Sequence, residues 1–155
     1  MFFRKDIVDL TEEGIAFDIP EKNGIGLTVY NGTDSTMAVG DVAVLTFGYA
    51  KGSYLKATTP ANSSVYQYVV VILETIESHA IGRVQVFGEC EAFVEGTTAV
   101  AAGDFLEVTN TKNEFYKDGS RSVNSAAIAV DAQDTDGNVL STVFLLGDRV
   151  IIAAS

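Results

Sequence analysis

The chain has 155 residues, of which 47% are apolar, 21 are acidic and 10 are basic, and its formal net charge at pH 7 is −11. A chain of this length suits one domain and buries about 70% of the surface that it exposes when unfolded. The negative charge opposes binding to phosphate backbones and to anionic membranes, because both recruit Lys and Arg. We therefore expect neither nucleic acid nor a membrane among its partners.

Cysteine content and the first residues bear on where the protein is made. Cys90 is the only cysteine in the sequence, so no intramolecular disulfide can form. Residues 1–6 combine two phenylalanines with three charged residues, unlike a signal peptide, and no run of 18 apolar residues occurs. We expect a protein that is made and kept in the cytosol of the cell that produces it.

The first part of the chain is the least regular. Residues 1–25 show no repeating pattern, so we expect an N-terminal arm or edge segment there, followed by a β-domain over residues 26–155. The first clear strand covers residues 26–30 and ends at Asn31-Gly32, a strong turn dipeptide. The next strand is predicted at residues 42–47.

A loop and a buried strand are expected next. Residues 48–64 contain glycine, proline, asparagine and serine, and they predict a long loop that carries Tyr49 and Tyr54. A long loop in a compact domain is usually a functional or interacting segment. Residues 65–73 become continuously apolar toward their end, which predicts a central strand that is buried on both faces.

The clearest alternation of the chain runs from residue 83 to residue 94. One face carries Val84, Val86, Gly88, Cys90, Ala92 and Val94, and the other carries Arg83, Gln85, Phe87, Glu89, Glu91 and Phe93. Gly88 in the middle of this run indicates a bulge or the close approach of another backbone segment.

The remaining pattern completes an all-β prediction. Further strands are expected at residues 105–109, 125–132, 139–146 and 149–153. The polar segment 110–121 predicts a hairpin that contains Asp118-Gly119, and Asp136-Gly137 predicts another hairpin turn. No segment shows helical periodicity over twelve or more residues. We predict a single-domain β-sandwich or barrel of short antiparallel strands with an irregular N-terminal arm.

A Gly-Asp pair precedes an alternating apolar run at three places: Gly40-Asp41, Gly103-Asp104 and Gly147-Asp148. Glycine takes the backbone conformation of a tight turn, and aspartate hydrogen-bonds the amides of that turn. The first two pairs follow similar residues, Ala38-Val39 and Ala101-Ala102, which suggests a duplicated β-unit. Convergent turn chemistry is the alternative.

Candidate catalytic and metal-binding residues are few. His79 is the only histidine and lies in a turn-like segment, which predicts a surface residue rather than a catalytic one. Cys90 on an apolar strand face predicts a buried, unreactive thiol. The acidic segment 131–138 lacks the EF-hand spacing, because Ala132 stands where the first ligand is needed. Weak calcium binding there is the alternative; we expect no enzymatic activity, cofactor or metal.

Aromatic residues on the arm and on the expected loop are the candidate residues of an interface with a partner or a second subunit: Phe2, Phe3, Tyr49 and Tyr54. Aromatic side chains outside regular elements often anchor an interface. The alternative is that they fold back onto the core of their own domain.

Several strand and turn segments resemble small structural proteins of tailed bacteriophages, specifically the head decoration (cement) proteins. These segments are Val29–Thr33, Met37–Leu45, Ala57–Asn62, Gly82–Cys90, Val94–Thr98, Ala102–Leu106, Ser122–Ala129 and Val143–Gly147. Residues 1–25 match none of these patterns.

The resemblance implies a compact β-domain that binds the outside of an expanded capsid, commonly near three-fold or quasi-three-fold axes and as a homotrimer. Its partner would be the major capsid protein, and its location the exterior of the virion after synthesis in the host cytoplasm. It would stabilise the head against the pressure of packaged DNA. Two other classes stay open: a carbohydrate-binding or fibre-like surface adhesion module, and a small β-barrel enzyme.

Deleting residues 1–5 should leave the fold intact and weaken binding to phage heads or trimer formation. Phe2 and Phe3 place two large apolar side chains at a chain end, and burial of each contributes roughly 1.5–3 kcal/mol, which several copies combine through avidity. Head binding and sedimentation of the truncated and full chains measure this effect. Equally tight head binding by the truncated chain would make the segment 48–64 the better anchor.

Overall fold

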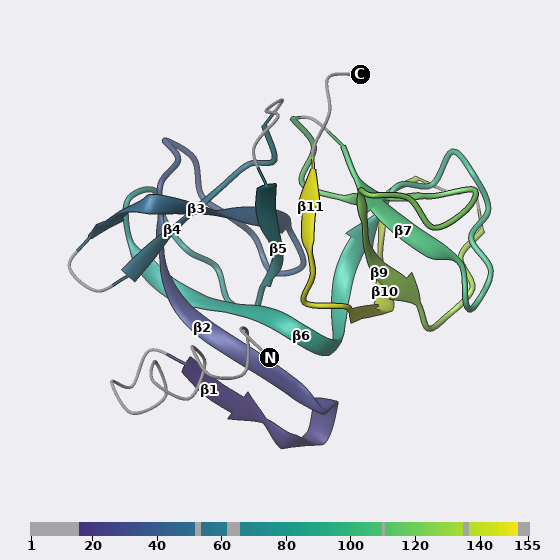
Figure 1. Cartoon of the computed structure of the whole chain (residues 1–155), viewed down its shortest axis with the longest axis horizontal. Helices are drawn as coiled ribbons and strands as arrows, with labels where there is room; N and C mark the ends of the chain where they lie inside the picture. Colours follow the sequence, from purple (N-terminus) through teal and green to yellow (C-terminus); the bar gives the residue numbers. More distant parts are fainter. Residues whose placement is uncertain (1–15, 52–53, 62–65, 110, 135–136, 152–155) are drawn as a thin grey trace.

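The computed structural model describes residues 16–51, 54–61, 66–109, 111–134 and 137–151, which form eleven strands and one short 3₁₀ helix (Figure 1). The elements are β1 (Ala16–Ile19), η1 (Pro20–Lys22), β2 (Gly24–Asn31), β3 (Val42–Lys51), β4 (Tyr54–Thr58), β5 (Tyr66–Ile72), β6 (Ile81–Val94), β7 (Phe105–Val108), β8 (Phe115–Lys117), β9 (Ser125–Ala129), β10 (Val139–Leu145) and β11 (Arg149–Ile151). The all-β prediction is confirmed. Within these ranges no helix is both long and apolar enough to cross a membrane.

Five strands form a closed first barrel, in the order β2, β4, β3, β5 and β6. β2 runs parallel to β4, and every other neighbouring pair in this ring is antiparallel. The ring closes where β2 pairs with residues 81–87 of β6. Outside the ring, β1 pairs with the start of β2 and β11 pairs with the start of β5.

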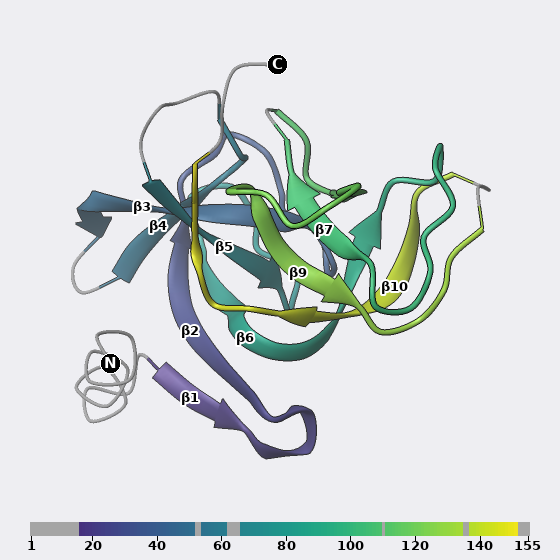
Figure 2. The same cartoon turned by 45° about the vertical axis from the view of Figure 1, so that its right-hand side comes forward.

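A second ring follows from the other half of β6. Residues 88–94 of β6 pair with β10, and the order continues through β9, β7 and β8. β8 returns to β6 through a short parallel contact between Phe115 and Val94. Figure 2 shows β6 curving out of the first barrel and into the second. The fold is therefore two small barrels that share one strand.

The two rings repeat one arrangement. In each ring, the first and third strands in chain order are parallel neighbours, namely β2 and β4 in the first ring and β6 and β8 in the second. The other neighbouring strands are antiparallel, and β6 is the last strand of the first ring and the first strand of the second. The turns before β3 and β7 repeat as well: Gly40 donates its N–H to Ile72 O at 2.9 Å, and Gly103 donates to Ala129 O at 2.8 Å. These equivalences support the duplicated β-unit.

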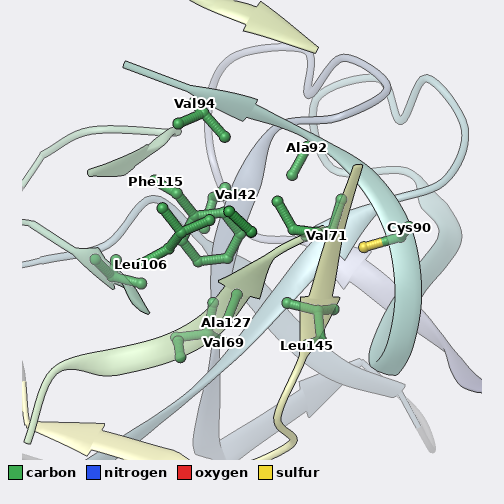
Figure 3. Packing of buried hydrophobic residues seen from close by; sticks show 14 of the residues in the cluster. Val42, Val69, Val71, Cys90, Ala92, Val94, Leu106, Phe115, Ala127 and Leu145 are labelled. Atoms are coloured by element: carbon green, nitrogen blue, oxygen red, sulfur yellow. The ribbon is translucent and has the colours of Figure 1, made fainter. Parts of the chain in front are cut away.

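One wall is shared between the two hydrophobic cores. Alternate residues of β3 and β5 point into the first barrel, namely Ala43, Leu45, Val70 and Ile72. Their neighbours join the core of the second barrel, namely Val42, Val44, Val69 and Val71, where they lie beside Leu106, Phe115 and Leu145 (Figure 3). The prediction that residues 65–73 contain a strand buried on both faces is confirmed.

Strand β6 keeps the expected alternation, with a disturbance near its middle. Gln85 belongs to the polar face but is only 1% exposed, and its Nε2 donates to Phe87 O at 3.0 Å and Glu89 O at 2.8 Å. The register with β2 shifts at this point, because Gly26 pairs with Gln85 and Ile25 pairs with Phe87. The predicted irregularity near Gly88 is confirmed, and the amide side chain of Gln85 supplies hydrogen bonds to the backbone there.

The prediction of a long loop at residues 48–64 is wrong. β3 continues to Lys51 and β4 begins at Tyr54, so most of the segment is a β-hairpin. β4 lies between β3 and β2 and pairs with both. Pairing on two edges satisfies the backbone groups of the segment, which outweighs the local tendency of its glycines to interrupt a strand.

The prediction that a hairpin in segment 110–121 contains Asp118-Gly119 is also wrong. The connection between the antiparallel strands β7 and β8 covers residues 109–114, and Asp118 follows β8. Its carboxylate accepts hydrogen bonds from Ser125 Oγ at 2.6 Å and from Ser122 N at 3.0 Å, which shape the connection to β9. An Asp-Gly pair suits several turn types, so it does not by itself locate a hairpin.

Two other predictions concern segments that the structure describes only in part. Asp136 of the expected Asp136-Gly137 turn lies outside them, although β9 and β10 form an antiparallel pair on either side. The boundary expected after residue 25 falls within β2, and the described part of the preceding segment contains β1 and η1.

Replacing Gly88 by alanine should destabilise the fold more than replacing Gly103 by alanine. Both glycines have φ above +90°, so alanine adds about 1–2 kcal/mol of strain at each. A Cβ at position 88 would also lie 2.6 Å from Asn23 O and Gly24 Cα, whereas position 103 has no atom within 4 Å. We expect the free energy of unfolding, measured with urea, to fall by about 3 kcal/mol or more for Gly88→Ala and by about 1–2 kcal/mol for Gly103→Ala. Equal losses of the two variants would contradict the close backbone approach at Gly88.

The equivalent Gly-Asp turns differ in electrostatics. Asp41 and Asp104 each accept a hydrogen bond at 2.8 Å from a backbone N–H three residues earlier, of Ala38 and Ala101. Asp104 also lies 2.8 Å from Lys117 Nζ, whose hydrogen bond lowers the pKa of the Asp104 carboxyl. Burial raises the pKa of Asp41 instead, against the smaller effect of its hydrogen bond from Ala38.

Asparagine at the two turns should therefore have opposite pH dependence. Because the pKa of Asp104 is lowered in the folded state, its ionisation stabilises the fold at pH values above the ordinary pKa of 3.8. This stabilisation is lost as the pH falls below 3.8 and through the lowered pKa. Asp104→Asn should melt a few degrees lower than the wild type at pH 7, with a difference that shrinks below pH 4. Because the raised pKa of Asp41 makes its ionisation oppose folding above 3.8, Asp41→Asn should lose little at pH 7 and become relatively less stable in acid. Thermal melts across pH that change in parallel would contradict this.

Candidate interaction surface

The structure places two of the four aromatic residues that the sequence singled out. Tyr49 lies in β3, and Tyr54 is the first residue of β4, opposite Lys51. The Tyr54 side chain is half-buried and packs against the core of the first barrel. Phe2 and Phe3 lie outside the described residues. For Tyr54, this packing agrees with the alternative interpretation, in which the aromatic ring folds back onto the core of its own domain.

His79 links two loops at one end of the first barrel. It lies between β5 and β6 with φ of +59°, and its Nδ1 lies 2.8 Å from Tyr30 Oη while its Nε2 lies 2.9 Å from Asp34 Oδ1. Asp34 is almost fully exposed, so this ion pair adds little stability even when the imidazole is protonated. The prediction of a surface turn residue is confirmed, and both ring nitrogens are already engaged, one by Tyr30 of β2 and the other by Asp34 of the loop after β2.

Cys90 is enclosed by the second core. It is 4% exposed, and burial is the main reason that the pKa of its thiol rises to about 12. The thiolate that nucleophilic or metal chemistry needs is therefore scarce at neutral pH. Across the described ranges, no group of three or more His, Cys, Asp or Glu side chains is arranged to hold a metal ion.

An apolar area is exposed on the outer face of β6 and β10. We call the residues Val39, Phe93 and Leu140 the β6–β10 surface. Leu140 of β10 lies opposite Phe93 of β6 in the register, and Phe93 donates its N–H to Gly40 O at 2.9 Å. Val39 is 45% exposed and Leu140 is 46% exposed, while Phe93 is half-buried. Exposed apolar side chains gathered in one place favour contact with another molecule.

Three hollows border the β6–β10 surface. The first reaches from η1 to Val39 and Glu91. The second lies beside Phe93 and is lined also by Asp41, Thr111, Lys112, Asn113, Glu114 and Asn138. The third lies beside Leu140 and is lined also by Glu91, Asp131, Ala132, Gln133, Asp134, Val139, Ser141 and Thr142. The apolar residues thus project between depressions whose charged residues are mainly acidic.

Sequence reasoning did not single out this surface, although one signal was present. Phe93 stands on the polar face of the alternating strand, in line with Glu89 and Glu91, which is unusual for a large apolar side chain on a solvent face. Its neighbours Val39 and Leu140 are far away in the sequence and meet it only through the register of β6 with β10 and the turn before β3.

The fold defines the class of the protein as an all-β chain of two fused five-stranded barrels. Among solved structures it is similar to the crystal structure of the head fiber gp8.5 N base in bacteriophage phi29, with a TM-score of 0.51 and 11% sequence identity. The match covers 81% of this chain and 98% of that chain. At this identity the likeness concerns the fold alone. No protein-family model matches the chain, and no curated protein matches its sequence.

Proposed function

We propose that the chain is a structural protein of a bacteriophage head, which binds the outer surface of the capsid and stabilises the head as decoration proteins do. The observation that carries the proposal is the shared fold with the N base of a phage head fiber, over 98% of that chain. The strand and turn segments that resemble decoration proteins support it independently, because they were identified from the sequence.

The chemistry of the described residues is consistent with a structural role. His79 is held by Tyr30 and Asp34 on the surface, and Cys90 is buried with a raised pKa. A protein that works by binding needs a stable scaffold and a complementary surface, and it needs no activated nucleophile.

The partner that we propose is the major capsid protein, bound by a homotrimer of this chain on the capsid exterior. The net charge of −11 supports contacts that are apolar, hydrogen-bonded or matched to basic residues of the partner. Trimer formation would multiply a weak contact of each copy through avidity.

A fibre-type adhesion module is the second candidate, because the similar structure is described as the base of a head fiber. The two candidates differ in what lies beyond the capsid. A decoration protein acts on the shell itself, whereas a base of a fibre carries a further element that reaches a sugar or a cell surface.

Adding the purified chain to heads that lack it, from the phage whose genome encodes it, should produce saturable density on the capsid exterior in electron microscopy. The decorated heads should release DNA at a higher temperature than undecorated heads, since a ligand that binds the intact state stabilises it. Sedimentation of the free chain should report a trimer. Heads that gain no density would refute the proposed function, and density without stabilisation would favour the fibre-type module.

A further inference from the structure

We infer that the β6–β10 surface is the docking site of this chain for a basic protein surface, one that presents an apolar depression flanked by Lys or Arg. The inference rests on the proposed function for the source of that surface, which is the phage head. It assigns the contact to residues other than the aromatic ones that the sequence suggested.

The apolar side chains of the surface are held in place before any partner arrives. A Cβ added to Gly40 would lie 2.2 Å from Leu140 Cδ2 and 3.5 Å from the Phe93 ring. Leu140 therefore occupies the space that a side chain at position 40 would fill, with the Phe93 ring beside it, and Gly40 O accepts the hydrogen bond from Phe93 N. Side chains that are ordered in advance lose little entropy on binding, so their burial contributes more fully to affinity.

The rim of the surface carries acidic charge that the molecule leaves unneutralised. Glu91, Asp131 and Asp134 border the hollow beside Leu140, whose described lining contains no basic residue. No ion pair to these three carboxylates occurs among the described residues. Among the basic residues that line the other two hollows, Lys22 pairs with Glu89 at 3.3 Å and Arg83 pairs with Glu74 at 3.1 Å, while Lys112 shares its hollow with two carboxylates, Asp41 and Glu114.

This rim selects the occupant. In a two-fold contact with a second copy, acidic rims would face each other, and in a three-fold contact the rim would meet another face of a chain whose net charge is −11. Like charges across an interface are unfavourable, whereas a basic rim on the partner gains attraction and faster association. A basic protein with an apolar depression therefore fits the surface better than another copy of this chain.

The first barrel offers a matched control. Ile81 of β6 is 47% exposed, nearly the same as Leu140, and pairs with Tyr30 as Leu140 pairs with Phe93. The charged surroundings of the two residues differ. Ile81 has His79 and Arg83 two residues away in the sequence, whereas Leu140 has the acidic rim of the β6–β10 surface beside it. The same substitution at Ile81 and Leu140 thus removes similar apolar exposure from two different electrostatic environments.

The test measures binding of full-length wild type, Leu140→Ser and Ile81→Ser to heads that lack this protein. Thermal melting first confirms that both variants are folded. Leu140→Ser should weaken head binding about tenfold, as expected for loss of a central apolar contact, and Ile81→Ser should bind like the wild type. Glu91→Lys should slow association at low salt, while Glu77→Lys, in the exposed connection before β6, should not.

The outcomes separate the inference from the proposed function. If the wild type fails to bind heads, both are overturned. If the wild type binds and Leu140→Ser binds equally well, the inference is overturned and the proposed function stands. A change of oligomeric state in Leu140→Ser, measured by sedimentation, would identify a second copy as the occupant and overturn the basic partner.

Discussion

Strand β6 satisfies its backbone hydrogen bonds against β2 along residues 81–87 and against β10 along residues 88–94. Gly88 stands where the partners change, and its missing side chain lets the start of β2 approach the strand. Because β6 contributes residues 81–87 to one ring and residues 88–94 to the next, one continuous strand joins the two barrels. The fold therefore behaves as one unit built from two repeats.

The shared wall of β3 and β5 couples the repeats through packing as well. Alternate side chains of these strands enter different cores, so a change of volume at Val70 is felt in the first barrel and a change at Val71 in the second. Small barrels of this kind are filled by their own side chains. Recognition then falls to the outside of the strands and to the turns between them.

The two repeats place similar positions in different surroundings. The pair Tyr30 and Ile81 in the first barrel corresponds to Phe93 and Leu140 in the second. His79 engages Tyr30 in the first barrel, whereas the backbone of Gly40 supports Phe93 and Leu140 in the second. The first two Gly-Asp turns differ in the same way, since Asp104 has a lysine within ion-pair distance and Asp41 has no ion pair among the described residues. Repeats with one topology can thus present different surfaces.

The sequence by itself determined the all-β class, the alternation of residues 83–94, the doubly buried strand near residues 65–73 and the interior position of Cys90. Each of these follows from local patterning, because side chains of a strand alternate between faces whatever its partners are. Tertiary structure decided which strands are neighbours. The β3–β4 hairpin, the position of the turn after β7 and the shared role of β6 depend on edges that meet across long stretches of sequence. The meeting of Val39, Phe93 and Leu140 depends on the same pairing, because hydrogen bonding between strands, and not the pattern within any one of them, sets the register.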